Sequence, residues 1–155
     1  MKKFFAAICA ATLLLTGCSQ NHAANSEAVT EPKISVTEAK NLDTITISVN
    51  GKTLTATLED NPTARAFVEM LPLEVDMQEL NGNEKYVYLD ADLPSKPEHV
   101  DRINAGDVML FGSNCVVIFY HDLSNGYSYT RIGRINPTDL KRMLGTGNVH
   151  VTFTR

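Results

Sequence analysis

The stretch TITISVNGKTLTATL, residues 44–58, decides the fold because it reads as two short β-strands joined by a tight turn. Apolar side chains alternate with small polar ones on both sides of Asn50-Gly51. Alternation with a period of two places one face of a strand in a core. Asn-Gly tolerates the positive φ angles that both central residues of a two-residue hairpin turn need. The stretch therefore predicts a hairpin whose inward face carries Ile45, Ile47, Val49, Leu54, Ala56 and Leu58.

A helix signal follows the hairpin directly. Asn61 suits an N-cap, Pro62 suits the first helical position, and Pro72 predicts that the helix ends at Leu71. Residues 136–145, NPTDLKRMLG, repeat the pattern with Asn-Pro at the start and a glycine at the stop. The two segments predict two helices. The apolar stripe of the first helix, which we expect to pack on a core, consists of Ala64, Phe67, Val68 and Leu71.

Most of the remaining residues predict strands. Residues 107–122, DVMLFGSNCVVIFYHD, read as two apolar strands around a Gly-Ser-Asn break. Residues 90–102 carry two prolines and mixed charge and predict a long surface loop. Many short antiparallel strands must stack or close on themselves, and closure removes edges that could aggregate. We therefore expect a mainly β protein, a small closed barrel of about eight strands with two helices. The further predicted strands are 73–78, 85–90, 125–135 and 148–155.

The first 17 residues have the composition of an export signal. Lys2 and Lys3 precede an apolar run from Phe4 to Leu15, which is too short to span a membrane as a helix. Leu15-Thr16-Gly17-Cys18 resembles the bacterial lipobox, whose cysteine is lipidated and becomes the new amino end. Several acyl chains, such as palmitate, anchor a protein stably, whereas one does so only marginally. We expect a lipoprotein of the cell envelope, held on the outer side of the plasma membrane or in the outer membrane.

These boundaries predict three parts of the chain. Residues 1–17 form the lipoprotein signal peptide, residues 18–41 form a flexible tether, and residues 42–155 form the folded domain. The tether is rich in Ser, Asn, Ala and Glu, and it lacks the large apolar side chains that would repay ordering.

Charge and residue spacing exclude several functions. The formal net charge is −4, and loss of Lys2 and Lys3 with the signal peptide moves it to −6, so we expect no nucleic-acid partner. The four histidines show no metal-ligand spacing, and we expect neither a metal site nor a cofactor. After lipidation of Cys18, Cys115 is the remaining cysteine of the mature chain. It lies within an apolar run and predicts a buried, unreactive thiol.

Four segments resemble the bacterial cyclophilin-like domain family. They are VNGKTLTATLEDNPTARAFVEMLP (49–72), LNGNEKYVYL (80–89), INAGDVMLFGSNCVVIFY (103–120) and YSYTRIGRI (127–135). The likeness runs from about Ile45 to Phe153. It implies the cyclophilin fold, an eight-stranded barrel with two helices, in agreement with the count of elements. Some family members are fused to, or encoded near, flavodoxin-like proteins, so the resemblance also suggests a flavodoxin-like redox partner.

True cyclophilins isomerise X-Pro bonds by placing an arginine near the proline nitrogen and the ring in an apolar pocket. The region of this chain that corresponds to the catalytic strand, residues 71–80, contains no arginine, and the chain contains no tryptophan. Tyr127, Tyr129 and Arg131 share one strand face by the two-residue period. Facing outward, they form a solvated aromatic and cationic ladder. Facing a groove, Arg131 is able to grip a carboxylate or carbonyl.

Two functions from different classes follow. The first is a non-enzymatic module, lipid-anchored through Cys18, that binds a peptide, a small molecule or an envelope protein. The alternative is a divergent peptidyl-prolyl isomerase acting on exported proteins, and a proline-peptide assay of the wild type and Arg131→Ala separates the two. No catalytic residue is assigned. The groove residues expected to bind the ligand are Phe67, Met70, Met77, Tyr86, Phe119, Tyr129 and Arg131.

Overall fold

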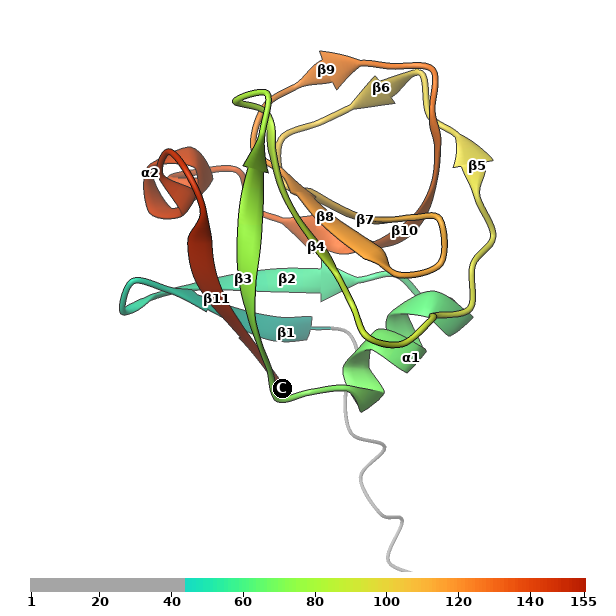
Figure 1. The fold of residues 1–155 in the computed structure, drawn as a ribbon, viewed down its shortest axis with the longest axis horizontal. Helices are drawn as coiled ribbons and strands as arrows, with labels where there is room; N and C mark the ends of the chain where they lie inside the picture. Colours follow the sequence, from blue (N-terminus) through green and yellow to red (C-terminus); the bar gives the residue numbers. More distant parts are fainter. Residues whose placement is uncertain (1–43) are drawn as a thin grey trace, which may run out of the picture. The chain divides into compact units, whose positions relative to one another are not determined.

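The computed structural model describes residues 44–155, which form a mainly β domain with two helices (Figure 1). Residues 1–43, including the predicted signal peptide, lipidated Cys18 and tether, lie outside the described residues. The elements, in chain order, are β1 (Thr44–Val49), β2 (Lys52–Leu58), α1 (Pro62–Glu69), β3 (Leu73–Leu80), β4 (Glu84–Tyr88), β5 (Glu98–His99), β6 (Arg102–Ile103), β7 (Asp107–Phe111), β8 (Cys115–Phe119), β9 (Leu123–Ser124), β10 (Ser128–Ile135), α2 (Leu140–Leu144) and β11 (Val149–Thr154).

Eight of these strands close into an antiparallel barrel, which confirms the predicted fold class. The strand order is β2-β1-β11-β3-β4-β8-β7-β10, and β10 pairs again with β2. The last strand, β11, lies between β1 and β3 and pairs with both. At the closing seam, a Cβ atom on Gly133 would lie 2.4 Å from the carbonyl oxygen of Thr57, so glycine permits the close approach of β10 and β2.

The first hairpin forms as its sequence predicts. Val49 pairs with Lys52, and the two turn residues Asn50 and Gly51 have φ angles of 49° and 73°. Positive φ at both positions is the conformation of a type I′ turn, whose twist matches that of the flanking strands.

Helix α1 starts as predicted but ends two residues earlier than Leu71. The side chain of Asn61 accepts a hydrogen bond from the N–H of Ala64 at 2.8 Å, and Pro62 occupies the first turn. The N–H groups of Met70 and Leu71 donate to carbonyl oxygens three residues back, so the last turn tightens and regular helix stops at Glu69.

The second helix starts three residues later than predicted. Asn136 does not cap it, because its side chain accepts from the N–H of Thr138 and closes a local turn. Asp139 stands at the N-cap with a positive φ of 65°, and α2 runs from Leu140 to Leu144. The stop at Gly145 is as predicted.

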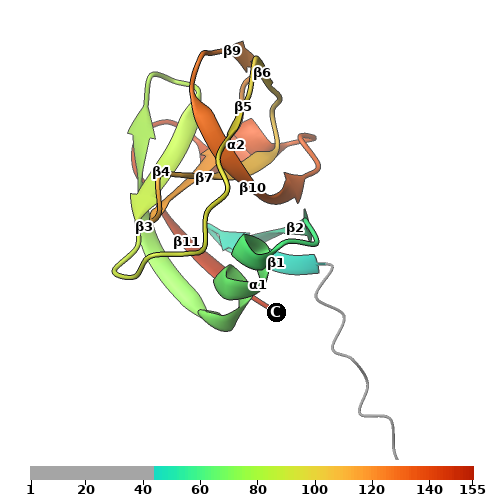
Figure 2. The same ribbon diagram turned by 90° about the vertical axis from the view of Figure 1, so that its right-hand side faces the viewer.

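The long loop predicted over residues 90–102 is interrupted by strand β5 and the start of β6. β5 pairs with the beginning of β10, and β6 pairs with β9 in a separate two-stranded sheet. Figures 1 and 2 both show β6 and β9 side by side, away from α1.

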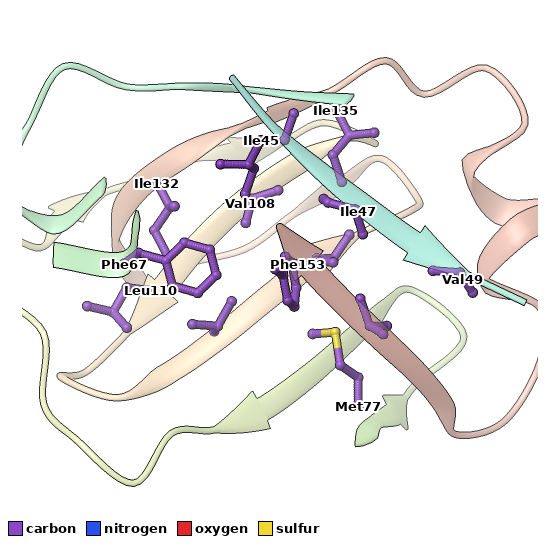
Figure 3. Packing of buried hydrophobic residues seen from close by; sticks show 14 of the residues in the cluster. Ile45, Ile47, Val49, Phe67, Met77, Val108, Leu110, Ile132, Ile135 and Phe153 are labelled. Atoms are coloured by element: carbon purple, nitrogen blue, oxygen red, sulfur yellow. The ribbon is translucent and has the colours of Figure 1, made fainter. Parts of the chain in front are cut away.

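The barrel interior holds the main core, drawn in Figure 3, where side chains from opposite walls meet. Phe67 of α1 and Phe153 of β11 pack edge to face, with ring centroids 5.4 Å apart. Helix α1 therefore closes one end of the barrel with its apolar stripe.

A polar plug fills the interior beside the loop that follows α2. Lys85 is fully buried, and its Nζ donates to the Glu79 carboxylate and to the carbonyl oxygens of Gly145 and Gly147. The hydroxyl of Tyr120 donates to Glu79 at 2.6 Å. All three protons of the ammonium have acceptors, as a buried charge requires.

A second, smaller core lies outside the barrel. Strands β7 and β8 are buried on both faces: Val116 and Ile118 point inward, whereas Val117 and Phe119 point outward. The outward set packs under Val100, Ile103 and Tyr129 from the segments that cross this side of the barrel. The outer core therefore gives this wall of the barrel an ordered, packed outer face on which a site can form.

Candidate functional site

An aromatic hollow of about 410 Å³ lies on the outer face of the barrel wall made by β3, β4, β7 and β8. Residues 123–127 and the start of β10 complete its lining. The hollow is mainly apolar, as ligand sites usually are. Its five aromatic rings belong to Tyr86, Tyr88, Phe111, Tyr127 and Tyr129.

Strand alternation brings these groups to one face. In β4, Lys85 and Val87 point into the barrel, so Glu84, Tyr86 and Tyr88 point outward. Pairing sets Tyr86 opposite Val117 and Tyr88 opposite Cys115 on β8. The next pair, Phe111 opposite Cys115, extends the same face onto β7.

The rim of the hollow is unusually apolar for a surface. Within residues 44–155, four large apolar or aromatic side chains are exposed: Leu80 (40 %), Tyr88 (62 %), Phe111 (43 %) and Tyr127 (62 %). All four line this one hollow. A concentration of exposed aromatic surface around a concavity is typical of a binding site, whereas scattered exposed residues carry no such meaning.

The rings contact one another and rest on the outer core. Phe111 packs against Tyr127 with centroids 6.0 Å apart and against Tyr129 at 5.5 Å. Tyr129 in turn meets buried Phe119 edge to face at 5.7 Å. Burial raises the pKa of Tyr129 to about 12, so this ring stays neutral at physiological pH. The packed base gives the hollow a preformed floor.

Three chemically distinct groups face the hollow besides the rings. Burial, together with the charge of Glu79, raises the pKa of the Glu84 carboxyl. Cys115 is a free, buried thiol; burial raises its pKa, with an opposing contribution from a hydrogen bond to Tyr88. The side-chain nitrogen of Asn125 is buried and has no hydrogen-bond partner among the described residues. The described residues lining the hollow include no Arg, Lys or His.

The buried thiol agrees with the sequence prediction for Cys115. Its raised pKa keeps the unreactive thiol form at neutral pH. Residues 44–155 contain no cluster of three or more His, Cys, Asp or Glu side chains that could hold a metal ion. No helix in the same part of the chain has the length and hydropathy to cross a bilayer.

A second cavity, of about 360 Å³, lies where the start of α1 meets residues 94–100 and β10. Arg131 lines it, with a side chain 46 % exposed and a nitrogen 3.8 Å from the buried carboxylate of Asp107. The Asn61 amide donates to the carbonyl oxygen of Arg131 at 2.8 Å, which ties α1 to this strand. The walls are of mixed charge, with Glu59, Lys96 and Glu98 among them.

The seven residues predicted to line one groove do not form one. Phe67 and Met77 are fully buried in the main core, and Met70 packs against it from the end of α1. Met77 lies on the inward row of β3, and Phe67 lies on the stripe by which α1 closes the barrel. These three predictions are corrected: strand alternation sends Met77 to the core, and the apolar stripe of α1 places Phe67 in it and Met70 against it.

The other predicted residues divide between two places. Tyr86 and Tyr129 line the aromatic hollow, whereas Phe119 is fully buried beneath it, so the prediction that Phe119 lines a groove is wrong. Arg131 lines the second cavity, which Tyr129 also borders. Sequence reasoning missed Glu84, Tyr88, Phe111 and Asn125, and it named Tyr127 only as a neighbour of Tyr129 and Arg131 on one strand face. The outward period of residues 84–88 was the signal for the first two.

The comparisons with known proteins agree with this architecture. The solution structure of a hypothetical protein from Archaeoglobus fulgidus superposes with a TM-score of 0.57 at 15 % identity. The superposition covers 76 % of this chain and 98 % of that one, and at this identity the likeness concerns the fold alone. No curated protein matches the chain. Residues 47–154 match the model of the Cyclophilin-like family, and they span the barrel, both helices and the hollow, so the chain belongs to the cyclophilin-like family.

Proposed function

We propose that this chain is a lipid-anchored binding module of the cell envelope, and that its aromatic hollow takes an apolar ligand. The observation that carries the proposal is the gathering of all four exposed large apolar side chains of residues 44–155 around one concavity. Exposed rings over a packed floor lose little entropy on binding, because the floor is already ordered. Burial of Tyr88 and Tyr127 by a ligand would remove their exposed area from water.

The residues of the hollow favour binding over isomerisation of X-Pro bonds. An isomerase of the cyclophilin type needs a cation close to the proline nitrogen, and the charged residue that lines the hollow is Glu84, an anion. Arg131, the arginine considered for that role, borders the other cavity. A proline-peptide isomerisation assay tests the alternative: a rate above background that Arg131→Ala removes would replace the module with an enzyme.

Ligand titration followed by NMR tests the module itself. The probe is the neutral peptide acetyl-Phe-Ala-amide, which presents a ring and carbonyl groups without charge. We expect shifts of backbone amides in β4, β8 and residues 123–127. Tyr88→Ala should weaken binding about fivefold, which corresponds to the roughly 1 kcal/mol of an aromatic contact. Arg131→Ala is the matched control and should leave binding unchanged. Absence of shifts around the hollow at millimolar peptide contradicts the proposal.

The membrane anchor is tested separately. Lipidation of Cys18 predicts that the wild type fractionates with membranes and that Cys18→Ser moves to the soluble fraction. A variant that stays with the membranes removes this part of the proposal. Pull-down of the full chain from envelope extract tests the flavodoxin-like partner that the family resemblance suggests.

A further inference from the structure

We propose that the aromatic hollow captures the free amino terminus of a peptide whose first residue is apolar. The inference rests on the proposed function and deepens it by naming the chemistry of the ligand. Three features of the hollow each match one part of such a terminus: a carboxylate, a ring-lined space and an unpaired amide donor.

The carboxylate of Glu84 is a negative charge without a counter-ion in the described part of the chain. It is half-buried at the start of β4, opposite Phe119, and no ion pair or side-chain hydrogen bond engages it within residues 44–155. The neighbouring Lys85 points to the other side of the strand and is fully used by the polar plug. A carboxylate held in an apolar wall gains most from a ligand that brings a positive charge and N–H donors.

The rings suit an ammonium group as well as an apolar side chain. Tyr86 and Tyr88 stand on the same outward row as Glu84 and pack edge to face, with centroids 5.9 Å apart. A cation over the face of an aromatic ring is attracted by its quadrupole, most strongly where water is excluded. The carboxylate and the tyrosine faces together can replace the water that an amino terminus loses on entry.

The amide of Asn125 supplies the third element. Its oxygen accepts a hydrogen bond from the N–H of Tyr127 at 2.8 Å, which fixes the amide and directs its NH₂ group away from that contact. The nitrogen is buried without a partner, and an unmet buried donor is costly. A ligand carbonyl oxygen satisfies it once the side chains that cover the nitrogen move aside. An amine, an adjacent carbonyl and an apolar side chain are the three groups that the first residue of a peptide carries.

The test compares two peptides on the full chain at about pH 6.5, below the α-amino pKa of about 7.7. Phe-Ala-amide has a charged terminus, and acetyl-Phe-Ala-amide has the same ring and carbonyl groups without it. We expect the free peptide to bind about tenfold tighter, as a charge-assisted hydrogen bond predicts. Glu84→Gln should reduce this preference to within twofold and leave the affinity for the acetylated peptide unchanged. Asn125→Ala should weaken both peptides.

The outcomes separate the two proposals. Equal affinity of the wild type for both peptides, or a preference that persists in Glu84→Gln, overturns amine capture and leaves the binding module standing. Failure of both peptides to perturb the hollow overturns the module and amine capture with it. The comparison of the two peptides on the wild type does not depend on any variant folding. Glu74→Gln, an exposed carboxylate on β3, is the control for a general loss of negative charge.

Discussion

Replacing Glu79 with glutamine removes the negative charge that faces the buried ammonium of Lys85. Lys85 is 0 % exposed, and its other two acceptors are the neutral carbonyls of Gly145 and Gly147. Removing one partner of a buried ion pair costs about 3–5 kcal/mol, because the other charge stays in the interior uncompensated. The Glu79 side chain is 21 % exposed, and the glutamine oxygen still accepts a hydrogen bond. Water therefore reaches the site, and we expect a loss of about 2–3 kcal/mol.

Urea denaturation at neutral pH measures this loss. Glu74→Gln serves as the control, because it changes the same residue type on the same strand at an exposed position. Its free energy of unfolding should stay within about 0.5 kcal/mol of the wild type. A Glu79→Gln loss below about 1 kcal/mol would show that the plug contributes little to stability.

The pH dependence gives a second check with a defined sign. Burial raises the pKa of Glu79, but hydrogen bonds from Lys85 and Tyr120, the charge of Lys85 and the N–H of Gly82 outweigh it, so the pKa lies below its ordinary value of 4.5. A lowered pKa stabilises the fold above the unfolded-state value, and the contribution is lost as pH falls through the folded-state value. The difference in free energy of unfolding between the wild type and Glu79→Gln should become smaller below about pH 4.5. A gap that stays constant from pH 7 to pH 3 would refute the reasoning.

Three further outcomes follow from other contacts. The pKa of Glu84 is raised by burial and by the charge of Glu79, so wild-type stability falls as pH rises from 4.5 through the folded-state pKa. Glu84→Gln does not show this pH-dependent loss of stability. Its free energy of unfolding, measured by urea denaturation, should be larger than that of the wild type at pH 7 but not at pH 4. Gly133→Ala places a Cβ 2.4 Å from a carbonyl oxygen of β2 and should cost about 1–3 kcal/mol by thermal denaturation, whereas Gly126→Ala, with nothing within 4 Å, should be neutral. Asn61→Ala loses the cap of α1 and the bond to Arg131, and urea denaturation should show a cost of about 1–2 kcal/mol, with Asn61→Asp keeping the acceptor and losing less.

Local signals in the sequence were sufficient for the fold. Asn50-Gly51 specifies its turn through backbone sterics alone, and Asn61-Pro62 specifies a helix start in the same way. The prediction for the start of the second helix was wrong because Asn136 closes a local turn with its own side chain instead of capping the helix.

The site depended on which face of each strand a loop covers, and no local pattern carries that information. Apart from Asp107 at the start of β7, strands β7 and β8 are apolar at every position, so a period of two cannot distinguish the interior from the outer core. Lys85 adds a second difficulty. A charged residue in a strand is expected to point outward, but Lys85 points into the barrel. If Lys85 is taken to point outward, Glu84, Tyr86 and Tyr88 are placed in the core, so the period of two groups these three on one face of β4 without showing that this face is the outer one.

The position of β11 has a consequence for how the chain becomes a folded protein. Its residues, Val149–Thr154, follow all the other strands in chain order, but the strand pairs on both sides in the middle of the sheet. Until β11 is in place, β1 has no neighbour on that side, and β3 presents an unpaired edge with which a strand of another molecule can pair. Removal of Val149–Thr154 would thus leave two unpaired strand edges rather than a slightly smaller barrel, and closure of the barrel needs a contact that spans about a hundred residues of chain.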